Sequence, residues 1–167
     1  GDRLVTRRYI APYNVPIVCY DFSTGTEIWS VNLPGAFQSL PLGCRDGHVC
    51  ALNYHESGDD SLYALDINDG SVIWQVLAPE LQYFYSPESG TFASDGDLIL
   101  GSLYSVNRYD KDTGSLLWSF ARVGFASGCS EAMVHESTVY AWTQSGGNFQ
   151  IVAINAVSGT ERYRVDI

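Results

Sequence analysis

The chain of 167 residues is 46% hydrophobic and 13% aromatic, enough apolar material for the core of one domain, and this composition excludes disorder for most of the chain. Its formal net charge of −10 excludes a generic nucleic-acid role, because phosphate binding needs a basic face. No apolar run approaches the roughly 20 residues of a membrane-spanning helix.

Two kinds of β-hairpin are predicted to alternate along the chain. The first kind spans 18–29 and recurs at 63–74, 107–118 and 152–163. The second kind spans 40–54, 91–101 and 133–143, with short turns such as Arg45-Asp46-Gly47 between two apolar runs. No segment has helical periodicity over three turns, so the chain is predicted to be all-β.

The first kind of hairpin carries three repeated columns of residues, spaced by 45, 44 and 45. The columns are Asp21, Asp66, Asp110 and Asn155; Gly25, Gly70, Gly114 and Gly159; and Trp29, Trp74, Trp118 and Tyr163. The Asp or Asn is expected to accept hydrogen bonds from backbone N–H groups of the turn, and the glycine supplies the positive φ that closes it. The aromatic residue is a large apolar anchor on the return strand.

Each repeat of about 45 residues therefore holds four antiparallel strands, which is typical of a β-propeller blade. The whole chain, 1–167, is predicted to hold about 3.7 blades, at 1–33 (incomplete), 34–78, 79–122 and 123–167. The start at 1–5 matches 95–99, the beginning of a second strand, so the first blade is predicted to lack its first strand. The three tryptophan anchors are expected to be largely buried where blades meet, with Trp29 more exposed than Trp74.

Two segments carry a resemblance to a known family. Ala64-Leu65-Asp66-x-x-Asp69-Gly70-x-x-x-Trp74 and Tyr109-Asp110-x-x-Thr113-Gly114-x-x-x-Trp118 are similar to the PQQ-like repeat of quinoprotein-dehydrogenase-like β-propellers. In the last repeat Asn155, Ser158 and Tyr163 depart from the pattern, which predicts a less regular blade. The resemblance implies a ring of usually about eight blades. The chain is thus expected to be about half of a ring, completed by further blades of the same chain or by a second copy.

Aromatic residues in the predicted loops are the candidate interaction site: Phe37, Tyr83, Phe84, Tyr85 and Phe125. Such residues are typical anchors of protein interfaces. Packing between blades is the alternative for Phe37, Tyr83 and Phe125, which follow the tryptophan of their blade by eight, nine and seven residues. The run 83–85 has no counterpart in the other repeats and favours recognition.

Metal, cofactor and nucleophile sites have little support in the sequence. Glu88 and Glu131 offer too few oxygens for calcium, and a solvated rim is the alternative for them. The tripeptide His-Glu-Ser occurs at 55–57 and 135–137, a separation of 80 that does not follow the repeat. The resemblance implies that PQQ-dependent relatives use a vicinal cysteine pair and a stacking tryptophan; no Cys-Cys pair occurs here, although Trp142 is an extra tryptophan.

The cysteines, at 19, 44, 50 and 129, leave two interpretations open. A two-residue turn at 46–47 would pair Cys44 with Val49 and leave Cys50 on the other side of the sheet. A Cys44–Cys50 disulfide and free thiols both remain compatible with this spacing. Another small group, Arg3, Arg7 and Arg8, is predicted to solubilise an edge strand or to contact an acidic partner.

The predicted function is a non-catalytic scaffold that binds protein partners through its loop face, with no cofactor, no nucleic acid and no membrane span. One alternative is part of a PQQ-dependent oxidoreductase, which would require PQQ and calcium. The other alternative is the ligand-sensing domain of a larger receptor. The resemblance implies a periplasmic or otherwise extracytoplasmic localisation.

Overall fold

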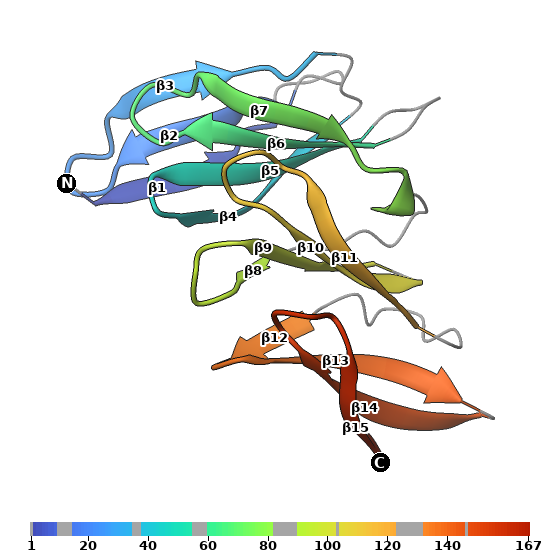
Figure 1. Cartoon of the computed structure of the whole chain (residues 1–167). Coiled ribbons are helices and arrows are strands. Elements are labelled where there is room, and N and C mark those ends of the chain that lie inside the picture. Colours follow the sequence, from blue (N-terminus) through green and yellow to red (C-terminus); the bar gives the residue numbers. More distant parts are fainter. Residues whose placement is uncertain are drawn as a thin grey trace. The chain divides into compact units, whose positions relative to one another are not determined.

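The computed structural model describes residues 2–9, 15–34, 38–54, 60–81, 90–102, 104–122, 132–145 and 147–167. These residues form fifteen strands and one short 3-10 helix, η1 (Pro79–Leu81). The strands belong to four antiparallel sheets (Figure 1). The prediction of an all-β chain built from propeller-type blades is confirmed.

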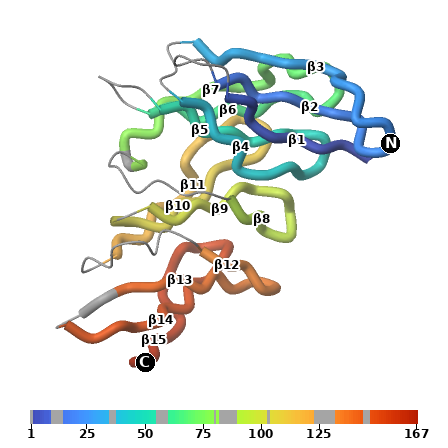
Figure 2. Tube along the Cα trace, turned by 180° about the vertical axis from the view of Figure 1, so that it is seen from behind, coloured from blue at the N-terminus to red at the C-terminus, as the bar shows by residue number. Residues whose placement is uncertain are grey.

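The first sheet has three strands in the order β1 (Arg3–Arg7), β2 (Ile17–Asp21) and β3 (Glu27–Val31). Its edge strand β1 pairs only with β2 among the described strands (Figure 2). Among the described strands, this sheet thus has three strands, one fewer than each of the other sheets.

The other three sheets have four strands each, and each follows the chain order. The second contains β4 (Gln38–Arg45), β5 (His48–Tyr54), β6 (Ser61–Asp66) and β7 (Val72–Leu77). The third contains β8 (Thr91–Phe92), β9 (Leu98–Gly101), β10 (Ser105–Tyr109) and β11 (Leu116–Ala121). The fourth contains β12 (Ala132–His135), β13 (Thr138–Ser145), β14 (Asn148–Asn155) and β15 (Glu161–Asp166).

The chain divides into two compact units, Gly1–Pro79 and Glu80–Ile167, with two sheets in each. In the first unit a buried cluster joins Ile17, Cys19 and Trp29 to Val49 and Leu65 of the neighbouring sheet. An equivalent cluster in the second unit joins sheet β8–β11 to sheet β12–β15. Burial of apolar side chains between the two sheets is the main stabilising contribution within each unit.

The turn between β4 and β5 shows why these sequences form hairpins. Asp46 and Gly47 have φ angles of 50° and 83°, as a two-residue type I′ turn requires. Cys44 pairs with Val49 and Arg45 with His48, which is the predicted register. A register shift between Pro41 and Gly43 then sets Gly43 opposite Cys50.

Candidate functional site

The repeated turns are held by their Asp or Asn side chain. Asp21 Oδ1 accepts hydrogen bonds from the backbone N–H groups of Ser23 and Thr24, both at 3.0 Å. Asp110 Oδ1 and Asn155 Oδ1 accept the corresponding bonds in their own turns. Hydrogen bonds from hydroxyl and backbone donors hold the pKa of Asp21 and of Asp110 below the usual aspartate range.

In both units, the tryptophan anchor of the first sheet contacts the turn of the second sheet. Trp29 Nε1 donates a 2.9 Å hydrogen bond to the Ile67 carbonyl, and Trp118 Nε1 donates a 3.0 Å bond to the Ala156 carbonyl. Both bonds span 38 residues of sequence. The indole rings lie on the turn glycines, since a Cβ on Gly70 would be 2.8 Å from the Trp29 ring and a Cβ on Gly159 would be 2.7 Å from the Trp118 ring.

The expectation that Trp29 is more exposed than Trp74 is wrong, because both side chains are 8% exposed. The Trp29 ring lies on the face of β1–β3 that β4–β7 covers, and this cover accounts for its burial. Trp118 is half-buried, and Tyr163 in the same column is 49% exposed. Trp29 and Trp118, which both contact the next sheet of their own unit, therefore still differ in burial.

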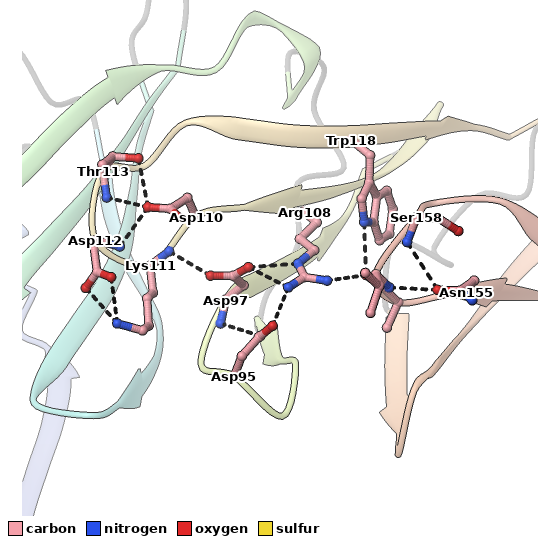
Figure 3. A network of polar contacts seen from close by, with 12 residues as sticks. Asp95, Asp97, Arg108, Asp110, Lys111, Asp112, Thr113, Trp118, Asn155 and Ser158 are labelled. Atoms are coloured by element: carbon pink, nitrogen blue, oxygen red, sulfur yellow. Dashed lines mark hydrogen bonds and ion pairs between the residues drawn. The ribbon is translucent and has the colours of Figure 1, made fainter.

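A buried arginine network joins the two sheets of the second unit (Figure 3). Arg108 donates to Asp97 Oδ2 through Nε at 2.8 Å and through Nη2 at 2.6 Å, and to Asp95 Oδ2 at 2.6 Å. Its Nη1 donates to the Ala156 carbonyl, which also accepts the Trp118 bond. The side chains of Arg108 and Asp97 are 6% and 10% exposed, so solvent weakens the attraction between their charges only slightly.

Buried polar groups brace the strand ends that carry the loops. Asn53 accepts a hydrogen bond from Ser39 and donates one to the Pro34 carbonyl, which ties β5 to β4 and to the segment that precedes β4. Burial raises the pKa of the nearby Tyr63 phenol, and its hydrogen bond with Asn53 partly opposes this rise. These bonds fix the adjoining ends of β4 and β5.

The third sheet has an equivalent brace. Ser102 and Ser105 share a 2.9 Å hydroxyl contact, and Asn107 donates to Ser105 Oγ at 2.9 Å. Arg122, at the end of β11, donates to the Ser102 carbonyl and, at 3.0 Å, to the Trp142 carbonyl of β13. Arg122 thereby connects the loop end of sheet β8–β11 to that of sheet β12–β15.

Sequence reasoning did not single out Arg108 or Arg122. Both could have been found by reading the repeat columns, since Arg108 occupies the column of Cys19, Ala64 and Ala153. Arg122 occupies the column of the buried apolar residues Leu33 and Ala78. A charged residue in an apolar column signals a buried ion pair or a hydrogen-bonded contact between sheets.

The predicted loop residues fall outside the described part of the chain. This holds for Phe37, Tyr83, Phe84, Tyr85, Phe125, Glu88 and Glu131, and for the tripeptide at 55–57. His135, the last residue of β12, and Glu136, in the turn that follows, are exposed, and Trp142 is 41% exposed on β13. Within the described ranges no group of three or more His, Cys, Asp or Glu side chains is placed to hold a metal ion.

The described cysteines are free thiols. Cys19 and Cys50 are buried and Cys44 is exposed, and burial raises the pKa of Cys50 to about 12. The register places Cys44 and Cys50 on opposite sides of their sheet, as the turn predicted. Cys129 lies outside the described residues.

The first-strand arginines lie at the surface. Arg3 and Arg7 are exposed on β1. Arg8 forms a 2.6 Å ion pair with Glu27, and both side chains are 40% exposed, so the pair contributes little to stability. No helix among the described residues is long and apolar enough to cross a membrane.

Comparison with known proteins gives one family and several structural likenesses. A family model described as "Outer membrane protein assembly factor BamB" matches residues 3–102. In sequence, the chain is 27% identical over 130 residues to the serine/threonine-protein kinase AfsK of Streptomyces coelicolor, which covers 75% of this chain and 14% of the kinase.

Solved structures agree on the fold. BamB from Moraxella catarrhalis has a TM-score of 0.62 at 18% identity, over 99% of this chain and 61% of BamB. Quinohemoprotein alcohol dehydrogenase from Comamonas testosteroni has a TM-score of 0.65 at 17% identity, over 96% of this chain and 33% of the enzyme. The chain thus spans less than two thirds of each of these relatives.

Proposed function

Because the chain belongs to the PQQ-like repeat family of the outer membrane protein assembly factor BamB, we propose that it is a non-catalytic scaffold that binds protein partners through its loop face. An assembly factor brings other proteins together, and blade loops on a rigid sheet scaffold suit that task. The aromatic run at 83–85 supplies the type of side chain that dominates the energy of protein interfaces.

One observation carries the proposal. At the described strand ends that bear the loops, buried polar groups such as Ser39, Asn53, Ser102 and Asn107 bond to one another or to backbone carbonyls. Their bonds rigidify the bases of the loops. A rigid platform lowers the entropy cost of binding a partner.

Site-specific photo-crosslinking in the native host tests this function. A crosslinking amino acid at position 83 or 85 should give a discrete protein adduct, and Tyr85→Ala should abolish the adduct obtained from position 83. The control is a crosslinker at Val72, which is 49% exposed on β7 but lies outside the loops. Equal adducts from Val72 and from the loop positions would contradict recognition through the loops.

The same relatives suggest two alternative functions. An oxidoreductase role would require PQQ and calcium, and dye-linked alcohol oxidation after reconstitution with both would support it over the scaffold. The similarity to the kinase AfsK favours the ligand-sensing domain of a larger receptor as a second candidate. A kinase domain in the same gene would support that candidate.

We also propose an extracytoplasmic location, in keeping with a family named for outer-membrane assembly. Cell fractionation, with a cytoplasmic and a periplasmic marker protein measured in parallel, tests it. Recovery with the cytoplasmic marker would contradict this location.

A further inference from the structure

The connection between β9 and β10 lies at the loop end of the third sheet, which is the end opposite the Asp110 turn. The Ser102 N–H donates a 2.7 Å hydrogen bond to the Ser105 carbonyl, and the Ser105 N–H donates to Ser102 Oγ at 3.2 Å. Both serines are buried. Their bonds fix the two sides of the connection.

Tyr104 is exposed in this connection, although its backbone is held. It is 52% exposed, and its carbonyl accepts a 2.7 Å hydrogen bond from the Arg122 N–H. It belongs to the connections of sheet β8–β11, which is neither the first nor the last of the four sheets. An exposed tyrosine on a fixed backbone suits protein recognition, because its large ring loses little conformational entropy on binding.

The backbone bond to Tyr104 recurs in the repeat, but the side chain of its donor does not. In the second repeat the Ala78 N–H donates to the Asp60 carbonyl at 2.8 Å. The donor column holds buried apolar residues, Leu33 and Ala78, in the first two repeats. Arg122 is also buried, at 7% exposure, and its guanidinium adds hydrogen bonds that an apolar side chain could not make.

The guanidinium of Arg122 ties this connection to the fourth sheet. Nη2 donates to the Ser102 carbonyl, and Nη1 donates to the Trp142 carbonyl of β13 at 3.0 Å. Arg122 therefore contacts both Ser102, where the connection begins, and Tyr104. These bonds hold the backbone of Tyr104 in place relative to β13.

We propose that Tyr104 is a contact residue for the protein partner of the loop face, and that Arg122 is the positioning residue that holds it. This inference rests on the proposed function, because it assigns described residues to the surface that the scaffold would use. The partner that fits presents a basic surface, because the chain has a formal charge of −10 and complementary charges favour encounter.

Photo-crosslinking in the native host tests the contact. A crosslinking amino acid at position 104 should give an adduct with the same partner as one at position 83. In the chain with the crosslinker at position 83, Tyr104→Ala should lower the adduct yield at least about tenfold, as truncation of an interface hot spot does. The matched control is Leu117→Ala, at a residue of β11 that is 50% exposed and lies near the opposite end of the same sheet.

The positioning role of Arg122 needs a separate readout. Arg122→Leu introduces the residue that the first repeat has at this position, Leu33, so the variant should fold. The yield from position 104, divided by the yield from position 83, should fall roughly two- to tenfold, the effect of losing about one hydrogen bond. A merely structural role would lower both yields in parallel and leave their ratio unchanged.

A hydrogen-bond variant at the other end of the sheet is the control for Arg122→Leu. Thr113→Val removes the hydroxyl that donates to Asp110 Oδ1 and contacts Ser115 Oγ. It should leave the ratio of the two yields unchanged. Thermal melting followed by circular dichroism, measured for each variant, identifies any loss of yield that comes from unfolding.

The outcomes separate this inference from the proposed function. An adduct from position 83 with none from position 104 would overturn the inference and leave the scaffold function standing, whereas no adduct from either position would contradict both. Equal losses for Tyr104→Ala and Leu117→Ala, or an unchanged ratio in Arg122→Leu, would also overturn the inference. In a host cell extract the yield should fall as salt is added, because salt screens charge attraction, and a yield that does not fall would overturn the basic partner.

Discussion

Two Gly→Ala substitutions measure how much the contact between an anchor ring and a turn glycine contributes to the free energy of unfolding. Gly70 and Gly25 have nearly the same backbone conformation, with φ of +74° and +68°. A Cβ on Gly70 would lie 2.8 Å from the Trp29 ring, whereas a Cβ on Gly25 would meet nothing within 4 Å. Both substitutions place an alanine in the left-handed backbone conformation, but only Gly70→Ala also brings the new Cβ against a tryptophan ring.

The left-handed backbone alone costs an alanine roughly 1–2 kcal/mol, so this is the expected loss of unfolding free energy for Gly25→Ala. Gly70→Ala adds the displacement of a buried ring, at about 1–3 kcal/mol, and a weaker hydrogen bond from Trp29 to Ile67, at about 0.5–1.5 kcal/mol. We therefore expect Gly70→Ala to be about 1.5–4.5 kcal/mol more destabilising than Gly25→Ala.

Urea unfolding followed by far-ultraviolet circular dichroism gives both free energies. A Trp29→Ala background supplies the control, because Gly70→Ala should there cost no more than Gly25→Ala in the unaltered chain. Equal destabilisation by Gly70→Ala and Gly25→Ala in the unaltered chain would refute the reasoning. So would an undiminished cost of Gly70→Ala in the Trp29→Ala background.

Three further predictions test the polar groups. Arg108→Ala should cost about 3–5 kcal/mol in urea unfolding because it leaves the buried carboxylate of Asp97 unpaired, while Arg8→Ala at the exposed pair with Glu27 should cost at most about 1 kcal/mol; similar losses would contradict the role of burial. Because the folded-state pKa of Asp110 lies below the ordinary value of 3.8, its turn contributes stability that is present above that value and lost as the pH falls through the lower, folded pKa. Asp110→Asn should therefore make the free energy of unfolding less dependent on pH in this acidic range, because an asparagine, such as the one in the Asn155 turn, does not titrate there. An unchanged pH dependence would contradict this reasoning. With a thiol reagent at neutral pH, Cys44→Ser should remove one rapidly reacting equivalent, while Cys50→Ser should remove only a slow one because Cys50 is buried with a pKa of about 12; fast labelling of Cys50 would refute its burial.

Local features of the fold could be predicted from the sequence alone. The column of Asp, Gly and aromatic residues encodes the turn, because a side-chain acceptor and a residue with positive φ act within a few residues of each other. The Asp46-Gly47 turn and the pairing of Cys44 with Val49 follow from the same local preferences. Alternating apolar residues on either side of these turns then predict antiparallel strands and the size of a blade.

The candidate interaction site was less accessible to this reasoning. Its aromatic residues belong to segments that the sequence predicts as loops, where neither periodicity nor turn chemistry dictates a conformation. The two buried arginines were missed because their partners are distant in sequence, as with Arg108 and Ala156, which are 48 residues apart. Only comparison of repeat columns could have marked them.

The sequence by itself determined the repeat, the all-β class and the turn conformations, since each depends on residues that are neighbours along the chain. Only the tertiary structure decided how far each anchor is buried, with Trp29 at 8% exposure and Trp118 half-buried although they share one column. The same holds for the burial of Arg108 against Asp97 and for the contact between Gly70 and the Trp29 ring. The physical reason is that burial depends on which sheet lies opposite a side chain, and at each junction that contact spans about one repeat length.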